Sequence, residues 1–176
     1  MKVQRLPIVG VMGSGKDDHL ELSLELGWLL GTLGVHLLTG GGRGTMAAVS
    51  EAFARTHDRR GMVLGILPSD HSRTKPKADY PNDWVEIPIV THLPHSGERG
   101  TESTSRNHIN ILTSDAIVAL PGGPGTSTEV QLAIRYGKPI IAYLGTTGGI
   151  PDLPQDVAVA TTIDQVEAFL RSVLLD

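Results

Sequence analysis

The residues best suited to chemistry lie in one glycine-rich segment, 120–129, which reads Leu-Pro-Gly-Gly-Pro-Gly-Thr-Ser-Thr-Glu. Gly122, Gly123 and Gly125 have no Cβ, so the backbone there can adopt positive φ angles and approach a ligand closely. If the segment joins a strand to a helix, its free backbone N–H groups and the helix dipole form a site for an anion, usually phosphate. Glu129 would then lie in the first helical turn, beside the ligand. The alternative is a strand-to-helix connection that needs glycine for its geometry alone.

Both flanks of this segment support a strand followed by a helix. Residues 116–120 form a short apolar run rich in β-branched side chains, which is typical of a strand buried on both faces of a parallel sheet. After the glycines, Thr126 or Ser127 is expected to cap a helix that stops at Gly137.

A second glycine turn, Gly-Val-Met-Gly-Ser-Gly-Lys at 10–16, follows the first predicted strand. Its spacing fits the phosphate-binding loop of nucleotide hydrolases, but Asp17 stands where that loop needs a Ser or Thr hydroxyl for magnesium. We therefore expect a simpler turn, in which the backbone of Gly13, Ser14 and Gly15 lines a ligand crevice.

A third glycine turn, Gly-Gly-Gly-Arg-Gly at 40–44, follows the second predicted strand. Gly41 and Gly42 are expected to bring the backbone close to a ligand, and Arg43 can offer phosphate a bidentate contact. A solvated position is the alternative for Arg43. The turn loosely matches the dinucleotide-binding fingerprint, but no acidic residue follows at the usual spacing, so the sequence gives NAD binding little support.

Arg106 stands at the start of a predicted helix, 105–112, which Thr104 or Ser105 can cap. The helix dipole disfavours a cation in the first turn, so either an anionic ligand or an ion pair is expected beside Arg106. His92 and His95 lie in the preceding loop. No third ligand stands at a recognisable spacing, so we predict no metal site and expect exposed or substrate-gating histidines.

The order of these segments predicts a three-layer, Rossmann-like α/β fold with a mostly parallel central sheet, in a single domain of residues 1–176. The loops at 68–83 and 91–105 are expected on the surface. In such a fold the three glycine turns gather at the carboxyl edge of the sheet, where one ligand can touch them all. The expected strands are 6–11, 35–39, 61–67, 84–90, 116–120, 138–144 and 158–160, and the expected helices are 20–33, 45–56, 105–112, 126–136 and 162–175.

Composition excludes several classes of function. The 176 residues contain no cysteine, which excludes disulfides, thiolate metal sites and a cysteine nucleophile. A formal net charge of −4 gives no support to broad nucleic-acid binding. No apolar run approaches the roughly 18 residues of a membrane span, and the first residues do not resemble a signal peptide, so we expect a cytoplasmic protein without a membrane partner.

The segment 121–129 resembles the PGGxGTxxE motif of the LONELY GUY family, once labelled lysine decarboxylase-like, which includes cytokinin-activating nucleoside monophosphate phosphoribohydrolases. The resemblance extends over nearly the whole chain, including the turns at 10–15 and 40–46. It implies that Arg106 and Glu129 are catalytic, and that the amides of Gly122, Gly123, Gly125 and Thr126 hold the 5′-phosphate of a nucleotide. It also implies a homodimer or larger homo-oligomer, and hydrolysis that needs no cofactor.

The same superfamily contains molybdenum cofactor carrier proteins, so a carrier that binds this pterin without catalysis is the second hypothesis. Asn107 stands where the phosphoribohydrolases usually have Lys, and an Arg-Asn pair also resembles the carriers. The turn at 40–46 is one residue shorter than in the enzymes. The stretch 71–104 fits neither pattern and is expected to set the identity of the ligand.

Overall fold

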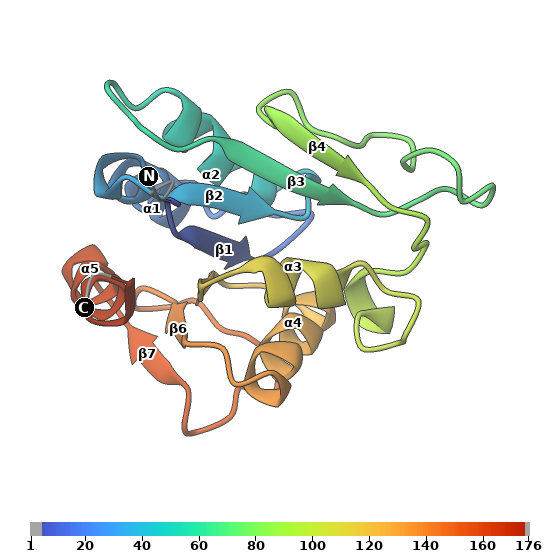
Figure 1. Ribbon diagram of the computed structural model, residues 1–176. Coiled ribbons are helices and arrows are strands. Elements are labelled where there is room, and N and C mark those ends of the chain that lie inside the picture. Colours follow the sequence, from blue (N-terminus) through green and yellow to red (C-terminus); the bar gives the residue numbers. More distant parts are fainter. Residues whose placement is uncertain (1–4, 175–176) are drawn as a thin grey trace.

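The computed structural model describes residues 5–174 and contains one seven-stranded sheet, in which every neighbouring pair of strands is parallel (Figure 1). The strand order is β4-β3-β2-β1-β5-β6-β7. This confirms the predicted Rossmann-like α/β class. The strands are β1 (Ile8–Met12), β2 (His36–Thr39), β3 (Val63–Leu67), β4 (Ile87–Val90), β5 (Ala116–Ala119), β6 (Ile140–Tyr143) and β7 (Ala158–Ala160).

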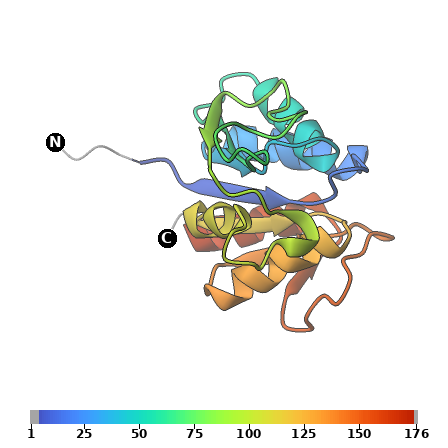
Figure 2. The same cartoon turned by 90° about the vertical axis from the view of Figure 1, so that its right-hand side faces the viewer.

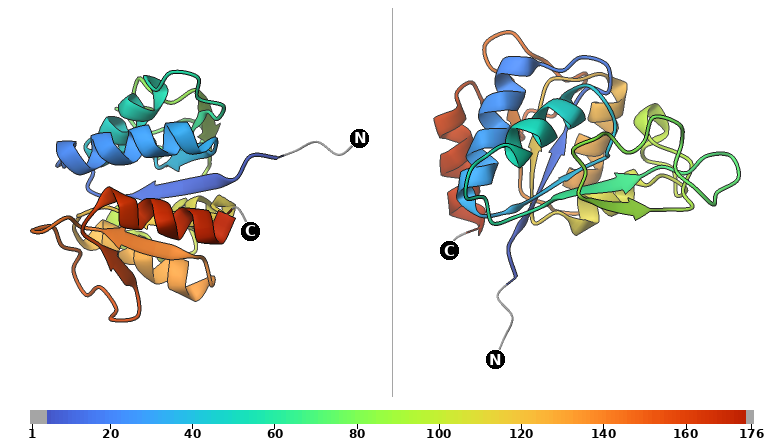
Figure 3. Two further views of the ribbon diagram at one scale, coloured as in Figure 1. Left: turned by 90° about the vertical axis from the view of Figure 1, so that its left-hand side faces the viewer. Right: turned by 90° about the horizontal axis from the view of Figure 1, so that it is seen from above.

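Helices cover both faces of the sheet, with α1, α2 and α5 on one face and α3 and α4 on the other (Figures 2 and 3). In the described part of the chain, no helix is long and apolar enough to cross a membrane. The helices are α1 (Leu20–Leu33), α2 (Thr45–Ala54), α3 (Asn107–Thr113), α4 (Pro124–Arg135) and α5 (Ile163–Leu174), and a short 3-10 helix, η1, spans Gly97–Arg99. The predicted extension of the last helix to Leu175 lies outside the described residues.

Strands such as β5 are continuous apolar runs in the sequence because the sheet is buried on both faces. All four residues of β5 are buried. Leu30 of α1, Phe53 of α2 and Leu170 of α5 pack on one side of the sheet, and Leu132 of α4 is among the residues that pack on the other. A strand between two helical layers has no polar face, which is why its sequence shows no alternation.

Three predicted helix caps are wrong. Helix α4 begins at Pro124 with Gly123 as N-cap, because proline has the φ angle that a first helical position needs and no N–H to satisfy. Helix α2 follows Gly44, which has a φ of 60°, and Thr45 donates its hydroxyl to the carbonyl of Asp17 at 3.1 Å. Helix α3 begins one residue after Arg106, so this residue precedes the first turn and serves as N-cap.

The chain changes direction across the sheet next to β1. It builds β2, β3 and β4 outward on one side of β1, and then crosses to place β5 on the other side. The loops after β1 and β5 therefore diverge from neighbouring strands, which is where open α/β sheets bind ligands. The N–H of Ser14 donates to the carbonyl of Pro121 at 3.3 Å, which joins the two glycine turns at this point.

The two edges of the sheet are short. Strand β4 has four residues, and its second residue, Pro88, pairs in register with Gly65 of β3. Ile87 and Val90 of this strand are exposed. Strand β7, at the other edge, has three residues.

Helices α1 and α2 pack closely because Gly27 lies at their contact. A Cβ at Gly27 would lie 2.5 Å from the Cβ of Ala52 and 2.7 Å from the carbonyl oxygen of Val49, far inside ordinary contact distance. The absence of a side chain on α1 therefore sets the distance between the two helices.

We predict that Gly27→Ala lowers the free energy of unfolding by about 1 to 3 kcal/mol, because the extra methyl group overpacks the contact between α1 and α2. Chemical denaturation with urea measures this change. The direction of the change in the free energy of unfolding tests the packing argument, since alanine normally stabilises a helix interior relative to glycine. Gly149→Ala is the control, because a Cβ there would meet nothing within 4 Å. A stabilised Gly27→Ala protein would contradict the packing argument.

Candidate functional site

A cleft of about 480 Å³ opens at the carboxyl edge of the sheet, at the change of direction between β1 and β5. Three segments distant in sequence form its walls: the loop after β1, the start of α4 and the loop that carries η1. Arg106 and Glu129 lie on its inner wall. The lining also includes Tyr80 from the long loop after β3.

The loop after β1 is a locked turn. The hydroxyl of Ser14 accepts hydrogen bonds from the backbone N–H groups of Lys16, at 3.1 Å, and Asp17, at 2.9 Å. The N–H of Thr45 donates to the carbonyls of Ser14 and Asp17 at 2.9 and 3.0 Å. The amides of Lys16 and Asp17 are thus engaged within the turn. The predicted residues Gly13, Ser14 and Gly15 all line the cleft.

The start of α4 presents backbone to the cleft. Gly123, Gly125 and Thr126 all line it, and the first N–H groups of a helix have no partner within the helix. A Cβ at Gly123 would meet nothing within 4 Å. Gly122 lies behind this surface: its N–H donates to Gly149 at 3.1 Å, and a Cβ there would lie 2.0 Å from the hydroxyl of Thr126. Gly122 therefore shapes the turn.

Arg106 is a buried cation, with only 3% of its surface exposed. Its Nη1 donates to Oδ1 of Asn107 at 2.6 Å, and its Nη2 donates to the carbonyl of Gly40 at 3.4 Å. Among the described residues, its buried Nε has no hydrogen-bond partner. A Cβ at Gly40 would lie 2.3 Å from Nη2, so the third glycine turn contributes to the cleft by leaving room for this guanidinium. Burial lowers the pKa of Arg106, and Glu129 opposes that effect.

Glu129 lies in the second turn of α4 and not in the first, because the helix begins earlier than the sequence suggests. Its Oε1 is 3.8 Å from Nη1 of Arg106. Burial raises the pKa of this carboxyl to about 7, although Arg106 and the nearby amide of Asn110 both act to lower it. Within residues 5–174, neither polar atom of the buried Asn110 amide completes a hydrogen bond. A carboxyl with this pKa exchanges its proton near neutral pH, as general acids and bases must.

The other predicted ligand residues, Gly41, Gly42 and Arg43, do not line the cleft. The carbonyls of Gly41 and Gly42 accept hydrogen bonds from Asn82, both at 2.8 Å. The side chain of Arg43 is 73% exposed and pairs with Asp79 at 2.9 Å, in a neighbouring hollow. Its role in binding phosphate therefore remains a prediction.

The stretch 71–104 was expected to set the identity of the ligand, but none of the cleft residues around η1 was predicted individually. Ser96, Gly97 and Glu98 line the cleft. The hydroxyl of Thr128 donates to the carbonyl of Gly97 at 2.9 Å, and this fixes the loop against α4. A Cβ at Gly125 would lie 3.0 Å from the Cα of Gly97. In the sequence, only the glycine at position 97 indicated that this loop could approach the start of α4 so closely.

The two histidines of this loop behave differently. His95 shares a hydrogen bond of 2.6 Å with Thr104 and lies 3.1 Å from a carboxylate oxygen of Glu102, whereas His92 is exposed. Across residues 5–174, no three His, Asp or Glu side chains are grouped so that they could hold a metal ion. His95 is half-buried and lines a hollow beside the cleft, whereas His92 does not line it.

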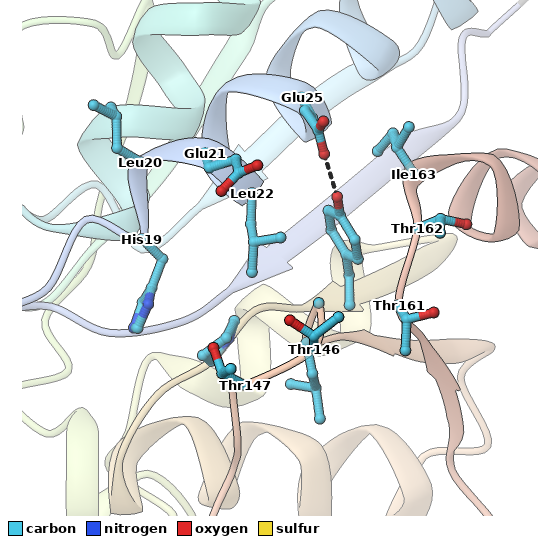
Figure 4. A pocket seen from close by; sticks show the side chains of 15 residues that line it. His19, Leu20, Glu21, Leu22, Glu25, Thr146, Thr147, Thr161, Thr162 and Ile163 are labelled. Atoms are coloured by element: carbon cyan, nitrogen blue, oxygen red, sulfur yellow. Dashed lines mark hydrogen bonds between the residues drawn. The ribbon is translucent and has the colours of Figure 1, made fainter.

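A second hollow, of about 500 Å³, lies beyond the end of β6 between the first turns of α1 and α5 (Figure 4). Glu21 and Glu25 belong to its lining, and among the described residues that form it there is no Lys or Arg. The hydroxyl of Tyr143 donates to Glu25, and burial together with this carboxylate raises the tyrosine pKa. Its acidic lining would repel a phosphate, so the glycine cleft is the better candidate.

The fold is Rossmann-like, and its cleft lies where the chain changes direction in a parallel sheet, which is the position at which such folds bind ligands. The chain belongs to the SLOG cluster4 family, whose family model matches residues 6–169. This confirms the resemblance to the LONELY GUY superfamily.

Two solved structures are similar to this chain in fold and sequence, and one curated protein is similar to it in sequence. The molybdenum cofactor binding protein of Rippkaea orientalis is 31% identical, with a TM-score of 0.75 over 97% of this chain and 99% of that one. The molybdenum cofactor carrier protein of Chlamydomonas reinhardtii is 32% identical, with a TM-score of 0.71 over 98% and 100%. The cytokinin riboside 5′-monophosphate phosphoribohydrolase LOG of Oryza sativa is 31% identical over 126 residues, 70% of this chain but 45% of the rice protein.

We predict that Glu129 makes the stability of the protein depend on pH. Its folded pKa of about 7 exceeds the ordinary value of 4.5, so the folded protein binds this proton more tightly than the unfolded chain does. The resulting stabilisation is complete below about pH 4.5 and is lost as the pH rises through about 7. Between about pH 5 and about pH 8, wild type should lose about 2.5 kcal/mol more than Glu129→Gln in urea unfolding. Equal losses would contradict the raised pKa.

Proposed function

We propose that the glycine cleft binds a phosphorylated nucleotide-like ligand and that the protein hydrolyses the N-glycosidic bond of a nucleoside 5′-monophosphate. The buried pair formed by Arg106 and Glu129 carries this proposal. A cation and a carboxylate that are almost completely removed from water are costly unless a ligand or a reaction uses them. Similarity to the rice phosphoribohydrolase supports the same reaction.

Binding of the phosphate would use the backbone. The N–H groups at the start of α4 and the turn of Gly13 to Gly15 face the same cleft, and the helix dipole favours negative charge there. Gly123 leaves open space for the approach, since a Cβ there would meet nothing within 4 Å. Arg106 adds a permanent positive charge, and its unpaired Nε is available as a donor.

The chemical step would depend on the carboxyl of Glu129. Water adds its oxygen to C1′ of the ribose, the bond from C1′ to the base nitrogen breaks, and the base leaves with the electron pair and takes up a proton. In this step ionised Glu129 accepts a proton from the attacking water and stabilises the positive charge that develops on the ribose. The low exposure of the site strengthens this electrostatic effect.

We predict that the purified protein releases free base from AMP or a related nucleotide. Glu129→Gln and Arg106→Ala should each lower the rate by at least about tenfold, because one removes the base and the other the anchoring charge. Chromatographic detection of the free base measures the reaction. Because ionised Glu129 is the active form, kcat/KM should rise as the pH increases through about 7.

Glu167→Gln is the matched control, since Glu167 is on α5 and pairs with Arg171 away from the cleft. Its rate should equal that of wild type. No base release from any nucleoside monophosphate in a panel would exclude the hydrolase function.

A second candidate function is that of a carrier for molybdenum cofactor, whose pterin phosphate would occupy the same backbone N–H groups. One observation favours it: the short contact of Arg106 is to the neutral amide of Asn107, at 2.6 Å, and Glu129 is farther away, at 3.8 Å. Similarity to the Rippkaea binding protein and the Chlamydomonas carrier covers nearly all of each chain.

A carrier should copurify with its cargo. We predict that co-expression with molybdenum cofactor synthesis yields protein that contains pterin, measured by fluorescence after oxidation. Gly123→Ala should reduce the pterin content because its methyl group fills the anion cradle, while Gly149→Ala, in a loop with free space, should not. Protein without pterin from cells that accumulate the cofactor would argue against a carrier.

A further inference from the structure

A third hollow, of about 1000 Å³, lies beside the glycine cleft, between the loop after β3 and the loop before η1. It is larger than the cleft and shares Ser96 with it. Both loops were expected on the surface, and the stretch 71–104 was expected to set the identity of the ligand. Their side chains form a pocket with a distinct chemistry.

The lining of this pocket is strongly basic. Arg73, Lys75, Lys77 and Arg99 contribute four cations, and among the described residues of the lining Asp70 is the only carboxylate. Asp70 is partly engaged elsewhere, since it accepts a hydrogen bond from Ser72 and lies 3.9 Å from Lys75.

The cations of the pocket are not equally free. Arg99 forms two hydrogen bonds with Glu102, at 2.6 and 2.8 Å. In the part of the chain that the structure describes, neither Arg73 nor Lys77 forms an ion pair with a carboxylate. Lys77 is half-buried, and burial together with the charge of Arg106 lowers its pKa. Among the described residues, two positive charges without a carboxylate partner therefore line the same pocket.

The buried hydroxyl of Ser69 is a second indication that the pocket binds a ligand. This residue is fully buried, and it lines the pocket. Its backbone N–H donates to Leu93 at 2.9 Å, but within residues 5–174 its hydroxyl has no hydrogen-bond partner. Buried hydroxyl groups are almost always satisfied in folded proteins, so an unpaired one in a pocket is suited to a ligand.

The basic pocket and the glycine cleft are neighbours in space. Lys77 lines the pocket, and Tyr80, three residues later, lines the cleft. Ser96 lines both, and Arg106 is near enough for its charge to help lower the pKa of Lys77. A ligand that enters the cleft therefore comes within reach of the pocket.

We infer that the basic pocket is a second anion-binding subsite, which receives a further phosphate group of a small-molecule ligand whose first phosphate lies on the glycine turns. Arg73 and Lys77 supply the charge, and Ser69 supplies a hydrogen bond. The inference rests on the proposed function only for the position of the first phosphate. The pocket binds its anion whether or not the protein is a hydrolase.

Inorganic pyrophosphate in metal-free buffer is the probe, and isothermal titration calorimetry in the presence of saturating ribose 5-phosphate measures its binding, because this product of the proposed reaction has no glycosidic bond left to hydrolyse. Pyrophosphate should bind to the wild-type protein loaded with ribose 5-phosphate. The double variant Arg73→Gln/Lys77→Gln should bind it at least about tenfold more weakly, because two charge-assisted hydrogen bonds are lost. The double variant Arg135→Gln/Arg171→Gln, which loses the same net charge at exposed positions, should bind it as wild type does.

Ser69→Ala separates a binding role from a structural one. The variant should keep or raise the melting temperature, since it removes a buried hydroxyl that has no partner, and should bind pyrophosphate about tenfold more weakly. Pyrophosphate that fails to bind, or binds equally well to Arg73→Gln/Lys77→Gln, would overturn the inference. A protein that binds pyrophosphate in this pocket but neither binds nor hydrolyses AMP would overturn the proposed function alone; for such a protein the titration is repeated without ribose 5-phosphate.

Discussion

The desolvated guanidinium of Arg106 is the constraint on which the candidate site depends. A cation with 3% exposure has lost most of its water, so the protein must supply hydrogen bonds and charge in return. Asn107, the carbonyl of Gly40 and the more distant carboxylate of Glu129 do so only partly. The requirement to compensate this buried guanidinium explains several features of the site. Residue 40 must be glycine, α4 must bring a carboxylate to this depth, and the cleft is predisposed to bind an anion.

The mutual dependence of Arg106 and Glu129 also explains why Glu129 is useful for chemistry. Burial alone would hold the carboxyl in its neutral form, and a nearby cation alone would hold it ionised. Burial outweighs the opposing effects of Arg106 and Asn110, and the pKa comes to about 7. The same pair therefore serves a hydrolase, as a proton acceptor, and a carrier, as a polar wall. The difference between these functions lies in where a ligand places its reactive bond, which the fold alone does not determine.

Much of the fold follows from sequence because buried parallel strands have a simple signature. The apolar run at 116–120 and the glycine turns predicted both the sheet and the edge where the site lies. Helix starts were less predictable, since Pro124 and Gly123 took the positions expected for Thr126 and Ser127. The start of α4 is set by the preferred φ angle of Pro124, and no side-chain hydroxyl caps the helix.

The site itself was only partly predictable, because loops bring distant residues together without any periodic pattern. Gly13, Gly123 and Arg106 are on the cleft, but Tyr80 and Ser96 reach it from long loops whose paths depend on tertiary contacts. Arg43 shows the reverse case: it follows a glycine turn, yet its side chain points to Asp79. The burial of Glu129, unlike that of the apolar strands, could not be predicted from the sequence, and the raised pKa of this residue depends on it.

The carboxyl edge of the sheet separates charge along its length. The hollow beyond β6 is acidic, the central cleft combines backbone donors with one buried cation, and the hollow beside β3 is basic. An anionic molecule that diffuses toward this edge would be repelled at one end and attracted at the other. Such a gradient orients a ligand before it makes any contact, and it becomes weaker as salt increases.

Pro88 in the edge strand β4 has a consequence for aggregation. A strand at the margin of a sheet offers its free N–H and C=O groups to any other extended chain, and natural proteins need a way to prevent this. Proline has no N–H to donate. Without it, the exposed Ile87 and Val90 would make this edge prone to pair with a strand of another chain. At the opposite margin β7 ends after three residues. The sheet thus resists growth by strand addition at both ends, and a partner would have to dock on helices or loops.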